Sequence, residues 1–193
     1  MRNTSITVGL SVLVLSITLS VLDPSYRSSA SNQERALPIG TPTSAIKVVS
    51  GWIPDLTSKE WDGTPITKTE AEWKKVMSSD QFYVLRNEGT ERAFTGKYTD
   101  NHEKGTYHCA ACGLVLFSSA AKFDSGTGWP SFFQPLYKKN IREKPDRSLA
   151  EERIEVECAP CGSHIGHVFD DGPPPTGSRY CLNSVSLVFQ KKK

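Results

Sequence analysis

CAACG, residues 109–113, and CAPCG, residues 158–162, are two copies of one cysteine turn. Each turn has two residues between its cysteines, a spacing that lets both sulfurs point into one half of a tetrahedron. The glycine that follows permits the backbone to turn beneath them. Four thiolates from two such turns complete a closed zinc shell. The pattern therefore predicts one structural Zn2+ per chain, holding two parts of a sheet together, with the ligands Cys109, Cys112, Cys158 and Cys161.

Two other interpretations of the paired cysteines remain open. Each pair could be a redox centre, or the cysteines could form disulfides after export. A thioredoxin-type redox motif lies between a strand and a helix, whereas each pair here lies in a glycine-bounded turn between strand-like segments. The duplication and the turn context favour the metal site.

The rest of the chain after residue 105 is typical of a mainly β fold. Gly, Pro and Asp clusters separate short runs of β-forming residues, and we expect strands at 106–108, 114–117, 154–157, 168–169 and 180–189. Upstream, Thr69 with Glu72 and Ser78 with Gln81 have the spacing of a capping box, which begins a helix. We therefore predict two short N-terminal helices, the second ending at Gly89.

The N-terminal third of the chain differs in composition from this domain. Residues 5–22 form an apolar run followed by small residues up to Ala30, so we interpret residues 1–30 as an export signal of a periplasmic or secreted protein. The run is also long enough to be a membrane anchor, and an organelle-targeting element or a buried core helix are further alternatives. Residues 31–66 carry repeated prolines and are expected to be a linker, which leaves 67–193 as a single domain.

The charge balance and the cysteine count exclude several classes of protein. Lys and Arg total 23 against 21 for Asp and Glu, so no basic surface for nucleic acid is expected. Five cysteines are too few for a disulfide-rich scaffold, and their odd number leaves one without an internal partner. Outside the two turns that cysteine is Cys181.

Cys181 lies in a run of β-forming residues from Arg179 to Phe189, which we expect to form one strand. Alternate side chains of a strand share a face, so Arg179, Cys181 and Asn183 should project together. A nearby cation lowers the pKa of a thiol and raises the fraction of thiolate. A buried structural cysteine in a core strand is an equally good interpretation of this run alone.

Two histidines directly after the second cysteine turn favour a catalytic role for the thiol. Histidine as a residue type titrates near neutrality, so the ring of His164 or His167 could donate a proton to an oxygen that leaves sulfur. Asp170 or Asp171 could orient such a ring. The histidines could also bind a metal, but four cysteines already complete one tetrahedral shell.

An aromatic cluster surrounds a double-glycine turn at residues 123–133. Core packing accounts for many such clusters. Aromatic rings also suit a substrate that carries a methyl group on sulfur, because polarizable sulfur packs well against them.

Three longer motifs join these features: GTGWPSF at 126–132, HIGHVFDDGP at 164–173 and RYCLN at 179–183. With the cysteine turns, they make residues 67–189 resemble the methionine-R-sulfoxide reductase family, type B. The resemblance implies two antiparallel sheets in a sandwich or barrel-like core, flanking short helices and a zinc remote from the reaction. It also implies a peptide-methionine (R)-S-oxide reductase that repairs oxidised proteins after oxidative stress.

The resemblance also implies roles for individual residues. The Cys181 thiolate attacks the sulfoxide sulfur, His167 with help from His164 protonates the oxygen, and Cys181 becomes a sulfenic acid. Arg179 favours the thiolate, whereas Asn183 and Asp171 order the polar network. In the substrate pocket, Trp129 packs on the methyl group and Phe169 forms a wall.

One departure from the family pattern concerns regeneration. Many members carry a resolving cysteine between the two glycines before Trp129, where this chain has Thr127. We therefore expect an external reductant, which is a thioredoxin-like or glutaredoxin-like protein or a small thiol, acting on a monomer. Two alternatives remain: a zinc-ribbon-like binding module, which needs no isolated thiol, and a zinc-dependent lyase, which needs an open metal position.

Overall fold

The computed structural model describes residues 56–149 and 151–193. The predicted export signal or anchor lies outside these residues. Among the described residues, none of the helices combines the length and the apolar character needed to cross a membrane.

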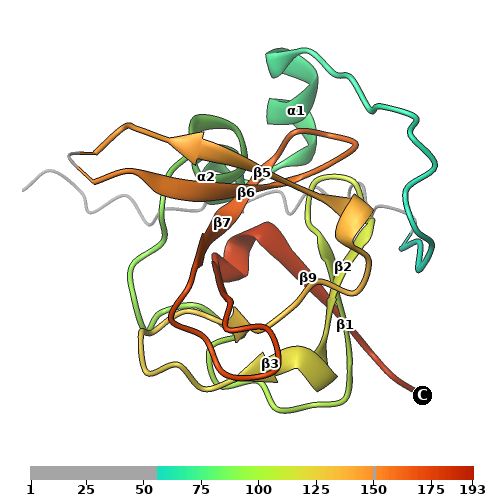
Figure 1. Ribbon diagram of the computed structural model, residues 1–193. Coiled ribbons are helices and arrows are strands. Elements are labelled where there is room, and N and C mark those ends of the chain that lie inside the picture. The colour runs from blue at the N-terminus through green and yellow to red at the C-terminus, as the bar shows by residue number, and fades with distance from the viewer. Residues whose placement is uncertain (1–55, 150) are drawn as a thin grey trace, which may run out of the picture. The chain divides into compact units, whose positions relative to one another are not determined.

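Two antiparallel sheets form the core, which confirms the predicted mainly β class (Figure 1). The smaller sheet has the strand order β2 (Val115–Ser118), β1 (Gly105–Cys109), β9 (Leu187–Lys191). The larger sheet has the order β3 (Lys122–Phe123), β4 (Ser131–Phe132), β8 (Arg179–Leu182), β7 (His164–Phe169), β6 (Arg153–Cys158), β5 (Ile141–Asp146). Two 3-10 turns, η1 (Ser119–Ala121) and η2 (Lys138–Asn140), precede β3 and β5.

Aromatic side chains join the two sheets. Tyr107 and Phe117 of the smaller sheet each lie against Phe132 of the larger one, with ring centroids 4.9 and 4.8 Å apart. Phe117 also lies 5.5 Å from the ring of Tyr180 on β8. All four rings are buried, so burial of their apolar area is a main source of the cohesion between the sheets.

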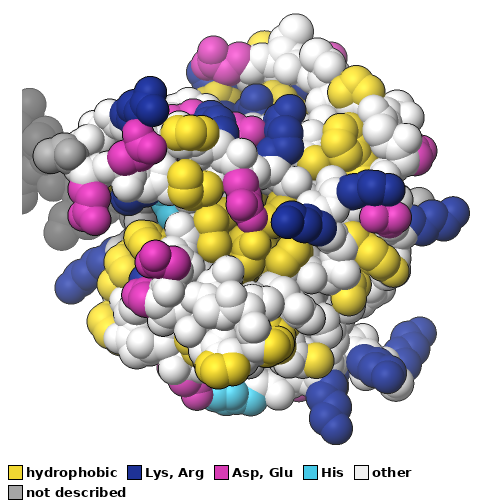
Figure 2. All heavy atoms as spheres, in the orientation of Figure 1, with side chains coloured by type: hydrophobic (Ala, Val, Ile, Leu, Met, Phe, Trp, Pro, Cys, Tyr) yellow, Lys and Arg dark blue, Asp and Glu magenta, His cyan; other side chains and the backbone are white. Residues whose placement is uncertain are grey.

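The outer surface carries charges of both signs. On the face shown in Figure 2, Lys and Arg side chains are interspersed with Asp and Glu side chains around a group of hydrophobic side chains. This mixture agrees with the nearly balanced totals of 23 basic and 21 acidic residues.

Both predicted helices are present with the predicted capping boxes. α1 (Glu70–Val76) begins after Thr69, and α2 (Ser79–Asn87) begins after Ser78. The predicted end at Gly89 is wrong by one position, because Glu88 adopts the left-handed conformation with φ 55°. The Gly89 amide then bonds the Tyr83 carbonyl at 3.1 Å, the pattern of a Schellman cap. A Cβ at position 89 would lie 2.3 Å from the exposed Tyr83 ring, which would have to turn away to make room for it.

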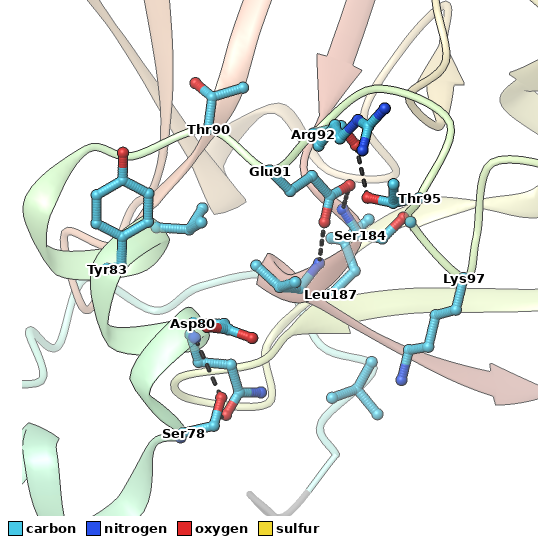
Figure 3. Close-up of a pocket in the computed structure, with 15 residues that line it drawn as sticks. Ser78, Asp80, Tyr83, Thr90, Glu91, Arg92, Thr95, Lys97, Ser184 and Leu187 are labelled. Atoms are coloured by element: carbon cyan, nitrogen blue, oxygen red, sulfur yellow. Dashed lines mark hydrogen bonds between the residues drawn. The ribbon is translucent and has the colours of Figure 1, made fainter. Parts of the chain in front are cut away.

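The single strand predicted at 180–189 is wrong. The chain leaves the larger sheet after β8, forms a 3-10 turn, η3 (Ser184–Ser186), and joins the smaller sheet as β9. The cause is a contact from far upstream. The Glu91 carboxylate accepts hydrogen bonds from the amides of Ser184 at 2.6 Å and Val185 at 3.0 Å (Figure 3), and so stabilises the turn.

Residues 56–66, the described part of the predicted linker, lie against the domain. Thr57 forms a parallel bridge with Leu114. The Trp61 amide donates to Asn140 Oδ1 at 2.7 Å, and the Ile66 amide donates to the Pro160 carbonyl at 2.7 Å. Asn140 is fully buried, so this contact ties the segment to the core.

Replacing Glu91 with alanine should lower the free energy of unfolding by about 2–4 kcal/mol, because two backbone amides lose their acceptor and the Ser184 amide lies in a buried residue. Glu103→Ala is the matched control, since Glu103 is half-exposed and forms only a surface ion pair with Lys191. Chemical denaturation of both variants measures the difference. Equal stability of the two variants would show that the Glu91 carboxylate does not hold the turn.

Candidate active site

Cys181 lies on β8, between β4 on one side and β7 on the other. It pairs directly with Ser131 of β4 and with His167 of β7. Direct partners in antiparallel strands share a face of the sheet, so a hydroxyl and an imidazole flank the thiol. Cys181 is partly exposed, unlike the four buried cysteines of the two turns.

The thiol opens into a small cleft of about 110 Å³. Five of the residues predicted for the site line it: Cys181, Trp129, His167, Phe169 and Asn183. Thr90 and Arg153 also line it. Neither residue belongs to a local motif, so sequence patterns alone do not indicate them.

A second, larger cavity of about 680 Å³ is shown in Figure 3. It shares the lining residue Thr90 with the cleft. Its lining residues include neither a cysteine nor a histidine. The partly exposed thiol and the His167 imidazole are therefore in the smaller cleft, although the larger cavity has more room.

Two features of β7, a bulge and a close approach at a glycine, bring its residues to the cleft. The pairing with β6 shifts by one residue between Val156 and Glu157, and this bulge breaks the strict alternation of faces. His164 and His167 consequently lie together, with ring centroids 5.3 Å apart. A Cβ on Gly166 would lie 2.2 Å from the Cys181 carbonyl oxygen, so only glycine permits this approach of the two strands.

Asp146 of β5 orients His167. The His167 Nε2 and Asp146 Oδ2 atoms are 2.8 Å apart, and Arg153 bonds the same carboxylate oxygen at 2.6 Å. Hydrogen bonds from Ser148 and from His167 hold the pKa of Asp146 well below its usual range. A carboxylate there makes Nε2 the protonated nitrogen and leaves Nδ1 available to a ligand in the cleft.

The prediction that Asp170 or Asp171 orients the imidazole is therefore wrong for His167. Asp171 instead accepts two hydrogen bonds from Arg179, at 2.8 and 2.9 Å. The partner of His167 could not be recognised from sequence spacing, because strand pairing brings Asp146 to it across β6.

Burial lowers the pKa of His167 from the usual 6.5, although the Asp146 carboxylate opposes that change. At neutral pH the ring in the empty cleft is therefore mainly uncharged. A negative charge that develops nearby would favour its protonated form.

His164 lies behind the cleft. It is buried, and its Nδ1 lies 2.7 Å from Glu155 Oε1. Lys144 in turn pairs with the other oxygen of Glu155 at 2.9 Å. His164 does not line the cleft, and its ring touches the cleft residue His167.

Arg179 contacts Phe169 and Asp171 together. Its guanidinium carbon lies 4.3 Å from the centre of the Phe169 ring, and the fork with Asp171 occupies two of its nitrogens. This arrangement fixes the wall that Phe169 presents to the cleft. It also places a counter-charge on the cation expected to activate the thiol.

Burial raises the pKa of the Cys181 thiol above the usual 9.0. The Thr127 hydroxyl, 3.7 Å from the sulfur, and the Arg179 charge both oppose that rise without overcoming it. Arg179 does lower the pKa of Cys181, as expected from the sequence, but burial raises this pKa by more than Arg179 lowers it.

Trp129 and Asn183 are held by one residue that the sequence did not reveal. The Trp129 indole donates to the Glu91 carbonyl at 3.1 Å, and the Glu91 amide donates to Asn183 Oδ1 at 3.0 Å. The Asn183 amide group also donates to the Ile165 carbonyl at 3.2 Å. Glu91 thus sets the distance between two walls of the cleft, in addition to stabilising η3.

The four remaining cysteines form a candidate metal centre. Their sulfurs all lie within 4.8 Å of one another, with Cys109 to Cys161 at 3.7 Å and Cys112 to Cys158 at 3.5 Å. A disulfide would require about 2.05 Å, whereas a tetrahedron with Zn–S bonds of about 2.3 Å separates its sulfurs by about 3.8 Å. All five cysteines are free thiols.

The backbone of the two turns also fits a metal. Gly113 and Gly162 have φ of 78° and 62°, and their amides bond the carbonyls of Cys109 and Cys158 at 2.8 and 2.9 Å. Burial raises the pKa of both of these thiols, so four neighbouring thiolates require a bound cation. The centre joins β1 of the smaller sheet to β6 of the larger one; it links two sheets, where the sequence suggested two parts of one.

Comparison with known proteins shows similarity to methionine sulfoxide reductases. The family model described as SelR domain matches residues 77–191. A peptide methionine sulfoxide reductase MsrB from Thiobacillus denitrificans is 58% identical over 125 residues, which cover 65% of this chain and 95% of that protein. The MsrB of Methanosarcina barkeri is 57% identical over 128 residues, covering 66% and 90% of the two chains.

A plant protein extends the similarity beyond prokaryotes. Peptide methionine sulfoxide reductase B1, chloroplastic, from Oryza sativa is 54% identical over 124 residues, which cover 64% of this chain and 58% of that protein. The matched region holds the cleft, the four-cysteine centre and both sheets, so the chain belongs to the SelR domain family, the type B methionine sulfoxide reductases.

Proposed function

We propose that the protein reduces the R epimer of methionine sulfoxide in proteins to methionine, and so repairs oxidative damage. One observation carries the proposal: a partly exposed thiol, Cys181, faces an imidazole, His167, directly across a strand pair in a small cleft walled by Trp129 and Phe169. The relatives that match are named peptide methionine sulfoxide reductases.

The chemistry follows from these groups. The Cys181 sulfur attacks the sulfoxide sulfur while His167 supplies a proton to the oxygen from Nδ1. The oxygen passes to Cys181, methionine leaves, and a sulfenic acid remains on Cys181. Two thiol groups of an external reductant then return Cys181 to the thiol, with release of water and formation of a disulfide in the reductant.

The distribution of cysteines supports the need for an external reductant. All four other cysteines are buried together in the metal centre, and Thr127 contributes a hydroxyl near Cys181 where a resolving cysteine would lie. A thioredoxin-like or glutaredoxin-like protein or a small thiol meets the chemical need. We also propose that the protein is a monomer, and that its first 30 residues export it or anchor it in a membrane. Sequencing the N-terminus of the mature protein would show whether these residues are cleaved or retained.

For the four-cysteine centre we propose Zn2+, because four thiolates with tetrahedral spacing and no open position suit this ion and a structural role. Cys109, Cys112, Cys158 and Cys161 would hold it. The ion would stabilise the contact between β1 and β6, and the chemistry at Cys181 does not require it as a reactant.

The assignment predicts stereoselective turnover. With dithiothreitol as reductant, the wild-type protein should reduce the R epimer of a peptide methionine sulfoxide, and Cys181→Ser should reduce neither epimer. Separate assays of the two epimers measure this. Folded, zinc-loaded protein that turns over neither epimer would instead favour a zinc-ribbon-like binding module.

The protonation states predict a bell-shaped pH dependence of kcat/KM. The reactive pair, thiolate with imidazolium, has the same number of protons as thiol with imidazole, so its population is constant between the two pKa values. The pKa of His167 lies below 6.5 and that of Cys181 above 9.0. The rate should therefore fall on the acidic side of pH 6.5, where both groups are protonated, and on the basic side of pH 9.0, where both have lost their protons. A kcat/KM that rises steadily from pH 6 to pH 9, as expected for a thiolate acting without the imidazolium, would contradict this reactive pair.

Removal of the metal should leave the nucleophile but weaken the fold. Native protein should contain one zinc ion per chain and expose one reactive thiol, whereas chelation in denaturant should expose all five. Elemental analysis and thiol titration measure both numbers, and thermal unfolding should occur at a lower temperature without zinc. A native protein with no bound metal and full stability would refute the structural role.

A further inference from the structure

Three hydroxyl groups connect the nucleophile to the backbone of the loop before β4. Thr127 Oγ1 lies 3.7 Å from Cys181 Sγ and 2.9 Å from Ser125 Oγ. Ser125 Oγ lies 2.7 Å from Ser131 Oγ, and Ser131 donates to the Trp129 carbonyl at 3.2 Å. Ser131 is fully buried and pairs with Cys181 across β4 and β8.

While Cys181 is a thiol, the number of available protons determines which group donates in each of these hydrogen bonds. Each hydroxyl has one proton to donate. Because Ser131 gives its proton to the Trp129 carbonyl, Ser125 must donate to Ser131, and Thr127 must donate to Ser125. The remaining contact is then a bond from the Cys181 thiol to Thr127 Oγ1.

A thiolate has no proton to give, so three hydroxyl protons remain for four contacts, and the contacts among Cys181, Thr127, Ser125 and Ser131 persist only with reversed direction. Thr127 then donates to the sulfur, Ser125 to Thr127, and Ser131 to Ser125, while the bond from Ser131 to the Trp129 carbonyl is given up. Every hydroxyl keeps its own proton and only rotates, while the thiol proton leaves the sulfur for the His167 ring, as in the reactive pair, or for the solvent. Hydrogen bonds to an anion are stronger than those between neutral groups, and neighbours in a chain strengthen one another.

We propose that Thr127, Ser125 and Ser131 form a reversible hydrogen-bond chain that stabilises the Cys181 thiolate, with Thr127 as the direct donor. Thr127 touches the reacting sulfur, whereas Ser125 acts through Thr127 and is a positioning residue. The inference rests on the proposed function in one respect, since it takes Cys181 as the nucleophile.

The charged groups around Cys181 are paired with other partners, so hydroxyl donors can contribute to stabilising its thiolate. On its own strand, Arg179 is held by Asp171. On β7, His167 is mainly uncharged and bonded to Asp146 of β5, which also pairs with Arg153 of β6. The Glu91 carboxylate is occupied by the amides of η3. Burial raises the pKa of Cys181, whereas the Thr127 hydroxyl, the Arg179 guanidinium and the Ser131 hydroxyl each lower it.

The test measures the pKa of Cys181 through the pH dependence of its alkylation by iodoacetamide, in the full-length zinc-loaded protein without sulfoxide. Zinc protects the other four cysteines, and peptide mass spectrometry identifies the alkylated residue. Thr127→Val, which removes the hydroxyl at nearly constant shape, should raise the apparent pKa by about one pH unit, or about a tenfold loss of thiolate below it. Thr127→Ser should restore the wild-type profile.

Two further variants distinguish a chain of three hydroxyls from a single hydrogen bond between Thr127 and Cys181. Ser125→Ala should raise the apparent pKa by less than Thr127→Val, because it removes a donor to Thr127 without touching the sulfur. Thr95→Val is the matched control: the Thr95 hydroxyl donates to the Arg92 carbonyl and lies away from the cleft, so its profile should match the wild type.

An unchanged profile for Thr127→Val, with a large rise for Arg179→Gln that vanishes at high salt, would overturn the proposal in favour of the cation alone. An alkylation profile of Ser125→Ala that matches the wild type would overturn the proposed reversible hydrogen-bond chain. Either failure is distinct from failure of the reductase assignment, because alkylation requires no sulfoxide.

Discussion

The pairing of β8 between β4 and β7 is the constraint on which the candidate site depends. It places Ser131, Cys181 and His167 in one row across the sheet, so the distances among hydroxyl, thiol and imidazole are set by backbone hydrogen bonds. Gly166 permits the close approach that this pairing needs. A site built on strands in this way keeps its geometry without help from a bound substrate.

The same burial that fixes the geometry disfavours the charged forms of both reacting groups. It raises the pKa of Cys181 and lowers that of His167, so the resting pair is mostly thiol and neutral imidazole. The protein opposes this with groups that favour charge, which are the Asp146 carboxylate at His167 and the hydroxyls near the sulfur. The charged pair can then form when the substrate's oxygen needs a proton.

Local patterns in the sequence predicted the parts of the structure that depend on neighbours in the chain. The cysteine turns, both capping boxes and the cluster of cleft residues at Trp129, His167 and Cys181 all fall within short motifs. The family resemblance supplied their expected roles, and the two-sheet core was confirmed.

The parts that sequence could not supply depend on contacts between distant segments. Asp146 reaches His167 only because β5, β6 and β7 pair in order. The run 180–189 has the composition of one strand, yet Glu91 stabilises a turn inside it. Propensity describes a segment by itself, and here a tertiary hydrogen bond outweighs it.

The most direct test of the account is a single turnover without reductant. Wild-type protein mixed with excess R-sulfoxide peptide should release one methionine per chain and gain one oxygen atom on Cys181, which dimedone should trap as a sulfenic acid. Mass spectrometry of the labelled peptide gives the position. An oxidised product that instead joins two of the four clustered cysteines in a disulfide, with Cys181 unmodified, would contradict the account.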